Sequence, residues 1–227
     1  ARHDAVAWGY ARAADRLGVE IHQNTEVTGL SIEGGRIRGV GTTRGFISTD
    51  CVISAVAGYT PRILKMAGLT SPIYVHPLQA MVSEPLKPWL DPIIVSGSLH
   101  VYVSQTARGE LVMGASLDPR ELHTARSSRE FVTNLAGHML DMFPFLAGVK
   151  INRQWAGLAD MTPDFAPIMG RTPVDGFYLD AGWGTWGFKA TPVAGETMAG
   201  TVASGRNHPL ITGFDWWRFD RFELTGE

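Results

Sequence analysis

The segment GWGTWGFKAT, residues 182–191, has the residue types best suited to bind a flat, negatively charged ligand. Its three glycines leave backbone N–H groups open to close approach, because no Cβ stands in the way. Lys189 adds a full positive charge, and a helix beginning near Pro192 would direct the positive end of its dipole to the same place. The segment therefore predicts a site for an anionic ring or a carboxylate. A solvent-exposed lysine beside tryptophans that only pack is the alternative without function.

Two predicted elements position this segment. The strand Phe177–Ala181 precedes the glycines, and a helix of small residues, 192–204, follows them. A strand, a glycine loop and a helix amino terminus in this order form a binding site for an anion or a ring edge. Farther on, DWWRFDRF, residues 215–222, is expected to pack as a strand or tail on the domain or on a partner subunit.

The first 60 residues predict part of a nucleotide-binding domain. Apolar residues at three- and four-residue spacing predict an amphipathic helix over residues 4–17, with Asp4 as the N-cap and Gly18 as the stop. Short alternating stretches separated by glycines then predict a β-meander, and CVISAVAG predicts a strand buried on both faces. This order is typical of the second half of a dinucleotide-binding domain. Because no G-x-G-x-x-G motif has an acidic residue about twenty positions later, either the fold is different or the phosphate-binding half lies upstream of Ala1.

Residues 61–150 predict an inserted antiparallel sheet with a covering helix. Prolines lead into IIVSGSLHVYVSQTARGELVMGASLD, which predicts two alternating strands joined by a turn around residues 107–109. The next segment, SSREFVTNLAGHMLDMFPFL, predicts a helix capped by Ser127 or Ser128 that lays an apolar face on the sheet. The predicted face consists of Phe131, Leu135, Met139 and Met142. With residues 1–60 and 151–227 as the flanking segments, the sequence predicts an α/β (α+β) fold class.

The composition excludes several classes of protein. The chain has 227 residues, of which 44% are hydrophobic and 19% charged, so it can build a sizeable core. A formal net charge of −2 with scattered basic residues argues against a nucleic-acid footprint and a polybasic membrane anchor. The sequence has no apolar run of the ~18 residues that cross a bilayer, no opening signal peptide and no predicted metal site. The single Cys51, in an apolar run, predicts a reducing compartment, and the cytoplasm is the expected location.

Two long stretches resemble the C-terminal half of the glycine oxidase and D-amino-acid oxidase superfamily of FAD enzymes. They are VTGLSIEGGRIRGVGTTRGFISTDCVISAVAG and MTPDFAPIMGRTPVDGFYLDAGWGTWGFKATPVAGE. Within that superfamily, ARHDAVAWGYARAADRLGVEI and GWGTWGFKATPVAGETMAG are most similar to the beta subunits of heterotetrameric sarcosine oxidases. The resemblance implies the C-terminal half of a Rossmann-like FAD-binding domain, with the inserted sheet as substrate domain. It also implies that the G-x-G-x-x-G unit belongs to an upstream half of the polypeptide.

The resemblance implies roles for individual residues. Lys189 corresponds to the lysine that binds the substrate carboxylate, and Tyr102 lies where the family walls the amine substrate, with His100 expected on the same face. His3 corresponds to the histidine that holds FMN covalently through its 8α-methyl group, with Asp4 or Arg2 as the orienting partner. The other positions are expected to hold FAD without a covalent bond: Val27 at the adenine; Ala57, Gly58 and Tyr59 at the phosphates or ribityl chain; and Gly182, Gly184, Thr185, Trp186, Gly187 and Phe188 at the flavin ring.

The activity that the resemblance implies is the oxidation of sarcosine by hydride transfer to FAD. Electrons would pass to FMN and then to O2, giving glycine, H2O2 and a one-carbon unit as formaldehyde or methylene-tetrahydrofolate. The expected partners are the other subunits of a hetero-oligomer, one of which would carry tetrahydrofolate and NAD. ELVMGASLD lacks the lysine that activates O2 in monomeric sarcosine oxidases, which favours transfer to a second flavin. The alternatives are dimethylglycine, glycine or proline as substrate, a flavin-bearing assembly subunit, and an α/β domain without flavin.

Overall fold

The computed structural model describes residues 2–115 and 117–225 of the chain. These residues form two compact units. The first takes the residues up to Val56, Thr60–Ser71 and those from Asp164 on, and the second takes Ala57–Tyr59 and Pro72–Pro163. No helix in the described ranges is long and apolar enough to cross a membrane.

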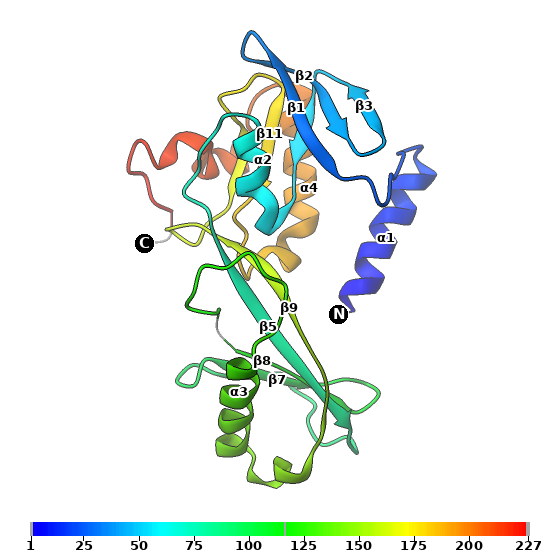
Figure 1. Ribbon diagram of the computed structural model, residues 1–227, viewed down its shortest axis with the longest axis vertical. Helices are drawn as coiled ribbons and strands as arrows, with labels where there is room; N and C mark the ends of the chain where they lie inside the picture. Colours follow the sequence, from blue (N-terminus) through cyan, green and yellow to red (C-terminus); the bar gives the residue numbers. More distant parts are fainter. Residues whose placement is uncertain (1, 116, 226–227) are drawn as a thin grey trace. The chain divides into compact units, whose positions relative to one another are not determined.

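The first unit begins with a helix and the predicted meander. Helix α1 (His3–Arg16) is followed by strands β1 (Val27–Glu33), β2 (Arg36–Thr42) and β3 (Gly45–Ser48). The strands pair antiparallel in the order β1-β2-β3, so the meander is confirmed (Figure 1). Gly34 and Gly35 both have positive φ in the tight turn between β1 and β2.

Helix α1 differs from the prediction in two respects. It begins at His3 with Arg2 as the N-cap, so Asp4 lies in the first turn and does not cap the helix. The Asp4 carboxylate instead accepts a hydrogen bond from Arg2 Nη2 at 2.5 Å. No residue of α1 is buried, and Trp8 and Tyr10 are 58% and 50% exposed. The described part of the chain therefore leaves the apolar face of this helix uncovered.

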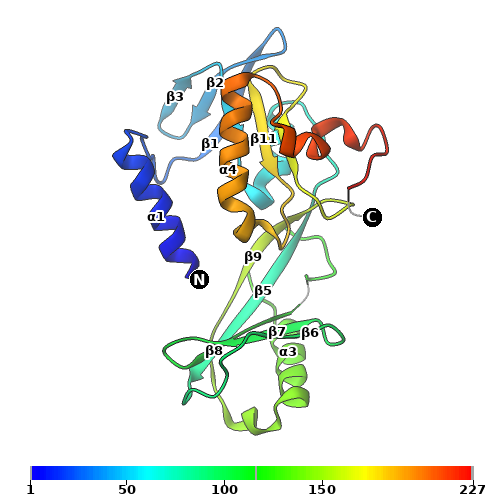
Figure 2. The ribbon, with the colours of Figure 1, turned by 180° about the vertical axis from the view of Figure 1, so that it is seen from behind.

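A second, three-stranded sheet carries the core of the first unit. Its strands are β4 (Val52–Ser54), β10 (Ile168–Arg171) and β11 (Phe177–Ala181), in the order β10-β11-β4. β11 is antiparallel to β10 and parallel to β4. Helix α4 (Gly187–Ser204) lies along β11 (Figure 2). Met169 and Tyr178 of the strands pack with Ala194 and Met198 of the helix.

The strand predicted in CVISAVAG is short and partly exposed. β4 spans three residues, of which Ser54 is buried and Ile53 is 46% exposed. The prediction of burial on both faces is wrong. β4 stands at the end of its sheet, with β11 as its one neighbour among the described strands, and the described residues leave the face that carries Ile53 partly open.

The helix after the glycines begins earlier than predicted. α4 starts at Gly187, and Pro192 lies inside it instead of near its first residue. The φ of proline suits a helix, and its missing N–H removes one backbone hydrogen bond close to the amino end. Lys189 therefore lies in the first turn of α4 and not in the loop before it.

The second unit is built on the predicted antiparallel sheet. Its strands are β5 (Tyr74–Pro85), β6 (Ile94–Ser96), β7 (Val101–Gln105), β8 (Glu110–Ala115) and β9 (Ile151–Met161), in the order β6-β7-β8-β5-β9. The turn between β7 and β8 is at the predicted place, with Gly109 in the left-handed conformation. β9 pairs with β5 over almost its whole length. The sheet thus includes residues that the sequence analysis assigned to the last segment.

Helix α3 (Arg129–Met142) covers one face of this sheet, as predicted (Figure 1). Ser128 is the N-cap, and its Oγ accepts a hydrogen bond from the Phe131 N–H at 3.1 Å. The buried core between helix and sheet consists of Met81, Leu90, Val101, Val103, Leu111, Met113, Leu135, Met139 and Leu146. The predicted apolar face of α3 is therefore confirmed.

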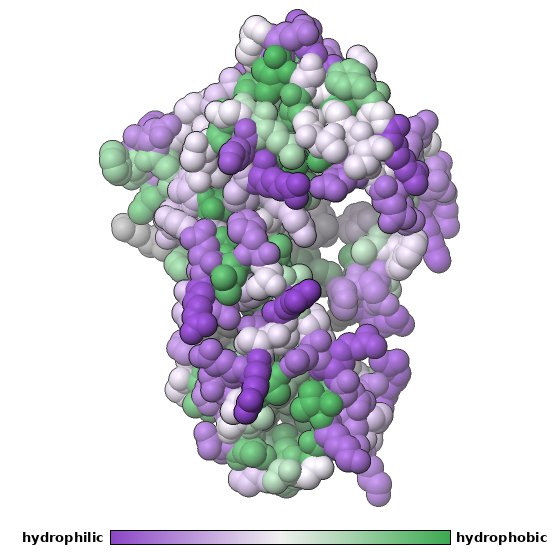
Figure 3. Space-filling model, in the orientation of Figure 1, coloured by the Kyte–Doolittle hydropathy of each residue, from purple (hydrophilic) through white to green (hydrophobic). Residues whose placement is uncertain are grey.

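Short helical segments complete the units. They are η1 (Ala57–Tyr59) and η2 (Pro144–Gly148) in the second unit and α2 (Thr60–Met66), η3 (Pro209–Phe214) and η4 (Trp216–Arg218) in the first. Beside η2 the ring of Trp89 meets Phe143 and Phe145 edge to face, with centroid distances of 5.3 and 5.0 Å. Figure 3 shows apolar side chains at this end of the second unit, the lower end of the view.

Candidate functional site

The glycine-rich segment forms a tight loop between β11 and α4. Gly182 and Gly184 have φ of 77° and 52°, a left-handed conformation that glycine adopts without strain. The Trp186 N–H donates to the Trp183 carbonyl at 2.9 Å, which closes a turn directly before the helix. With Gly187 the glycines have G-x-G-x-x-G spacing between a strand and a helix. No strand follows α4 in the described ranges, so the loop does not open a β-α-β unit of the dinucleotide-binding kind.

The amino end of α4 presents N–H groups and a cation. Trp186 is the N-cap and provides no side-chain cap, so the first-turn N–H groups have no acceptor from the cap or from within the helix. Lys189 Nζ lies 5.3 Å from the centroid of the Trp186 ring, a cation–π distance, and both side chains are exposed. A negatively charged group placed here would meet the N–H donors, the helix dipole and the ammonium together.

Two buried hydroxyl groups in the first unit test whether a polar cofactor fits. Ser54 Oγ, at the end of β4, and Thr60 Oγ1, at the start of α2, have no hydrogen-bond partner among the described residues, although both side chains are buried. Buried hydroxyls in folded proteins are normally hydrogen-bonded. Protein atoms cover these two hydroxyls, so they do not indicate a cofactor. The accessible groups that suit the ring oxygens of FAD are the first-turn N–H groups of α4 and Lys189, so the residues of the loop fit that cofactor.

The predicted FAD-contacting turn, Ala57–Tyr59, forms η1 and belongs to the second unit. Ala57 has a φ of 47°, and Tyr59 is 55% exposed. Gly58 is buried against β9, where a Cβ would clash with the side chain of Leu158. A glycine at this position therefore has a packing reason of its own within the second unit.

His3 and Val27 lie in the first unit, with the glycine loop. His3 is the first residue of α1 and is exposed, so its ring is accessible. Its expected orienting partners pair with each other: the hydrogen bond from Arg2 to Asp4 lowers the pKa of Asp4 and raises the pKa of Arg2. Val27 opens β1, is partly buried and stands opposite Thr42 of β2.

Tyr102 lies on the sheet face opposite to α3. Its neighbours Val101 and Val103 belong to the core under α3, so the alternation of the strand puts Tyr102 on the other face. Its ring lies over Gly114 of β8, where a Cβ would collide with it. Burial raises the pKa of the Tyr102 hydroxyl. His100, expected on the same face, lies instead in the turn before β7 with a φ of 52°, so that prediction is wrong.

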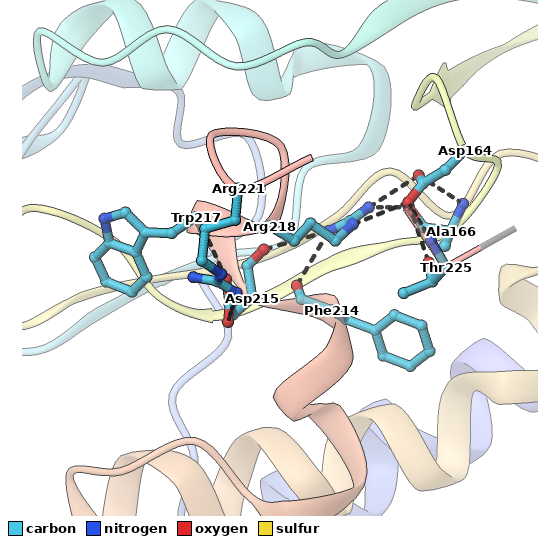
Figure 4. A network of polar contacts seen from close by, with 8 residues as sticks. All are labelled: Asp164, Ala166, Phe214, Asp215, Trp217, Arg218, Arg221 and Thr225. Atoms are coloured by element: carbon cyan, nitrogen blue, oxygen red, sulfur yellow. Dashed lines mark hydrogen bonds and ion pairs between the residues drawn. The ribbon is translucent and has the colours of Figure 1, made fainter. Parts of the chain in front are cut away.

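A buried ion pair ties the C-terminal segment to the residue that follows Pro163 (Figure 4). Arg218 Nε and Nη2 each donate to the Asp164 carboxylate at 3.0 Å, and both side chains are 1% exposed. Arg218 also donates to the carbonyls of Ala166 and Phe214, and Thr225 donates to Asp164. Burial by itself raises the pKa of Asp164, but the hydrogen bonds from Arg218, Thr225 and Ala166 and the charge of Arg218 together outweigh it and hold this pKa well below its usual range.

The sequence analysis did not find this pair. It predicted no polar contact for Asp164 or Arg218, and it predicted only that residues 215–222 pack as a strand or tail. Residues 215–222 form η4 and turns, so the strand alternative is wrong. The segment packs on the first unit as a tail, with Arg218 buried there. The two residues are 54 positions apart, and no local pattern marks them as partners.

A concave surface of about 540 Å³ lies elsewhere in the first unit. Among the residues that line it are Trp8, Arg12, Asp15 and Arg44, whose side chains are all exposed. None of the predicted site residues lines it. In the described ranges no three His, Cys, Asp or Glu side chains gather as a metal ion would need. The candidate site is therefore the glycine loop with the amino end of α4.

Comparison with known proteins agrees with this fold and loop. The family model for DAO, the FAD dependent oxidoreductases, matches residues 1–201. The chain therefore belongs to the DAO family of FAD dependent oxidoreductases. It is similar to the sarcosine oxidase subunit beta of Rhodobacter capsulatus, with 44% identity over 100% of this chain and 55% of that protein. The sarcosine oxidase subunit beta of Rhizobium meliloti is 46% identical over 98% of this chain and 53% of its own length.

The chain spans about half the length of these curated relatives. Among solved structures, the L-proline dehydrogenase of P. horikoshii matches with a TM-score of 0.88 and 30% identity over 95% of this chain and 59% of that one. Glycine oxidase from Geobacillus kaustophilus matches with a TM-score of 0.80 over 90% of this chain and 55% of that one, and its 20% identity shows the fold alone.

Proposed function

We propose that this chain is part of an FAD-dependent oxidase subunit that oxidises the N-methyl group of sarcosine. The observation that carries the proposal is the amino end of α4, where the first-turn N–H groups and the Lys189 ammonium lie on one helical turn. Such a helix end suits a substrate carboxylate and a ring that gains negative charge. Similarity over the whole chain to proteins named sarcosine oxidase subunit beta, at 42–46% identity, supports the choice of substrate.

The protein's part in this reaction is to bind and orient. Bound FAD would supply the chemistry by accepting a hydride from the N-methyl carbon of sarcosine. Lys189 would pair with the substrate carboxylate, and the N–H groups of Gly187 and Phe188 would stabilise negative charge on the ring. Tyr102 would wall the substrate and exclude water. The imine formed from sarcosine would hydrolyse to glycine and formaldehyde, or its one-carbon unit would pass to tetrahydrofolate.

The binding of FAD would draw on residues that are distant in the sequence. Val27 would lie at the adenine, η1 along the phosphates or ribityl chain, and residues 182–188 at the ring. The first-turn N–H groups of α4 support the last of these assignments, because they have no acceptor within the helix and suit a ring oxygen.

We further propose that His3 holds FMN covalently and that the electrons reach O2 from this second flavin, giving H2O2. The exposed position of His3 at the first residue of α1 supports the proposal, because neutral imidazole is a nucleophile and its ring is accessible here. The relatives are named as subunits, which supports a hetero-oligomer whose partner would carry tetrahydrofolate and NAD. The proposed location of this assembly is the cytoplasm.

L-Proline is the second candidate substrate. The observation that favours it is the match to L-proline dehydrogenase, which combines the TM-score of 0.88 with 30% identity. Proline and sarcosine are both secondary amino acids with a carboxylate, so Lys189 would bind either one. One extra or missing methylene group in a pocket is worth only about 1–3 kcal/mol, and such a difference in pocket size leaves no motif in the sequence.

The test is anaerobic reduction of the full-length subunit in its native complex. Sarcosine or L-proline is added in turn while the flavin absorbance is followed. If sarcosine bleaches the flavin at a lower concentration than L-proline does, sarcosine is supported as the substrate. If L-proline bleaches it at the lower concentration, L-proline is the better candidate. If neither amine bleaches the flavin, sarcosine and L-proline are both excluded as substrates.

A separate measurement tests the covalent flavin. The complex is denatured with acid and digested with trypsin, and the peptide HDAVAWGYAR, released after Arg2, is weighed by mass spectrometry. The mass of FMN on this peptide, with FAD free in the supernatant, supports attachment at His3. A bare peptide with FAD as the one released flavin excludes it.

A further inference from the structure

We propose that Trp183, held by Asp180, is a positioning residue for the amino end of α4 and therefore for Lys189. The proposal rests on the function above, because it affects catalysis only if that helix end binds flavin and substrate. Three contacts of the Trp183 residue carry it: with the end of β11, with the core under α4 and with the first residue of the helix.

The first two contacts hold the indole ring by its polar edge and by its apolar part. Its Nε1–H donates to Asp180 Oδ1 at 2.6 Å. Hydrogen bonds to a carboxylate are shorter and stronger than those between neutral groups. The rest of the side chain packs against the buried cluster that contains Met169, Met198 and Ile211. The strand thus anchors the polar edge of the ring, and the core anchors its apolar part.

The third contact sets the place where α4 begins. A Cβ on Gly187 would lie 2.9 Å from Trp183 Cβ, closer than real Cβ contacts, and 3.3 Å from Trp183 Cγ, which is also tight. Glycine is therefore required at the first helical position because the Trp183 side chain occupies the space beside it. The Trp183 carbonyl also accepts the N–H of Trp186, the N-cap.

The loop backbone alone would restrain this helix end poorly. Gly182 and Gly184, on either side of Trp183, are both left-handed, and glycine adopts many other conformations at little cost. Trp183 supplies the side-chain anchor between them. If the anchor is lost, the first-turn N–H groups and Lys189 shift together, and a shift of about 1 Å in such a group can reduce a rate up to ~10²-fold.

The experiment compares four single variants and one double variant of the full-length holoenzyme in its complex. Trp183→Phe keeps an aromatic ring and removes the N–H donor. Asp180→Leu removes the acceptor, whereas Asp180→Asn keeps an oxygen that can accept the bond. Trp217→Phe, in the C-terminal segment, is the matched tryptophan control. The probe is methoxyacetate, a carboxylate with the shape of sarcosine and no amine to oxidise, and its dissociation constant is read from the flavin spectrum.

We expect Trp183→Phe and Asp180→Leu each to raise the dissociation constant of methoxyacetate about tenfold, as a displaced binding group would. Asp180→Asn and Trp217→Phe should leave it close to the wild-type value. The double variant Trp183→Phe/Asp180→Leu should be no weaker than either single one, because both remove the same bond. Unchanged binding in Trp183→Phe, or additive effects in the double variant, would overturn the proposal.

Hydrogen exchange separates this inference from the proposed function. The amides of Ala190, Thr191 and Val193, near the amino end of α4, should exchange faster in Trp183→Phe than in wild type, and at the wild-type rate in Trp217→Phe. Equal exchange in Trp183→Phe and wild type overturns the positioning role whether or not sarcosine is the substrate. If the amides exchange faster in Trp183→Phe than in wild type, but sarcosine does not reduce the flavin of the wild-type complex, the positioning role is supported and the proposed function is excluded.

Discussion

Replacing Arg218 by methionine should destabilise the first unit through one buried ion pair. Methionine is apolar and unbranched, so it fills much of the space of the arginine stem and removes its donors. The Asp164 carboxylate, 1% exposed, would then keep the donors of Thr225 and Ala166. Removing one partner of a buried ion pair leaves an uncompensated charge and costs about 3–5 kcal/mol. We expect the free energy of unfolding to fall by that amount near neutral pH.

Arg221→Met is the matched control in the same segment. Arg221 also pairs with two carboxylates, donating to Asp215 and Glu223 at 2.8 Å each, but its side chain is 43% exposed. Exposed ion pairs contribute little to stability, because water solvates the separated charges nearly as well. The two variants therefore lose the same kind of pair and differ in burial.

The effect of Arg218→Met should depend on pH in a defined direction. The pKa of Asp164 is lowered in the folded wild type, so the pair contributes its full stability above the unfolded pKa of about 3.9 and loses it as the pH falls toward the lowered value. Without Arg218, burial raises this pKa, so the variant takes up a proton on acidification while the wild type stays ionised. The stability gap between them should be widest near neutral pH and narrow below about pH 5.

The assay is urea unfolding of the full-length protein, followed by tryptophan fluorescence at several pH values. If Arg218→Met and Arg221→Met lower the free energy of unfolding by the same amount, the reasoning is refuted, since burial of the ion pair would then make no difference. A gap that widens on acidification would contradict the assigned pKa direction.

The remaining predictions concern the site and two structural glycines. Lys189→Met should raise the KM for sarcosine about tenfold to a hundredfold with little change in FAD content, because a charge-assisted hydrogen bond contributes about 1.5–3 kcal/mol. Steady-state kinetics and flavin quantitation check this, and an unchanged KM would favour the assembly-subunit alternative. Gly114→Ala should displace the Tyr102 ring and lower the free energy of unfolding by about 1–3 kcal/mol, which the urea midpoint measures. If the KM for sarcosine stays unchanged in this variant, Tyr102 does not wall the substrate. Gly137→Ala, in α3 with open space at the Cβ, should raise the stability by about 0.5–1 kcal/mol. Gly109→Ala should lower the melting temperature, because the φ of Gly109 is 101° and a Cβ would meet the Leu86 carbonyl. Equal changes in melting temperature for the two variants would contradict the conformational argument.

Elements whose signals are local could be predicted from the sequence. Ser128 caps α3 and Leu135 and Met139 face the core, because capping and three- and four-residue spacing are properties of consecutive residues. The meander, the turn at Gly109 and the strand before the glycine loop were predicted for the same reason. The functional roles of Lys189, Tyr102 and His3 come from a resemblance and remain predictions.

Predictions failed where a residue had several local options and its neighbours in space chose among them. Asp4 could cap a helix, but Arg2 binds its carboxylate and the helix starts one residue earlier. Pro192 could open a helix, but α4 starts at Gly187, where the Trp183 side chain lies. His100 has the alternation of a strand residue, but it falls in a left-handed turn.

The sequence by itself determined the two kinds of sheet, the covering helix α3, and a glycine loop that runs from a strand into a helix, because these depend on spacing and conformational preference along the chain. Only the tertiary structure decided that Lys189 lies in the first turn of α4, that Trp183 joins Asp180 to Gly187, and that Arg218 is buried on Asp164. The physical reason is that a buried hydrogen bond or ion pair depends on which groups lose water together, and that is a property of the folded chain.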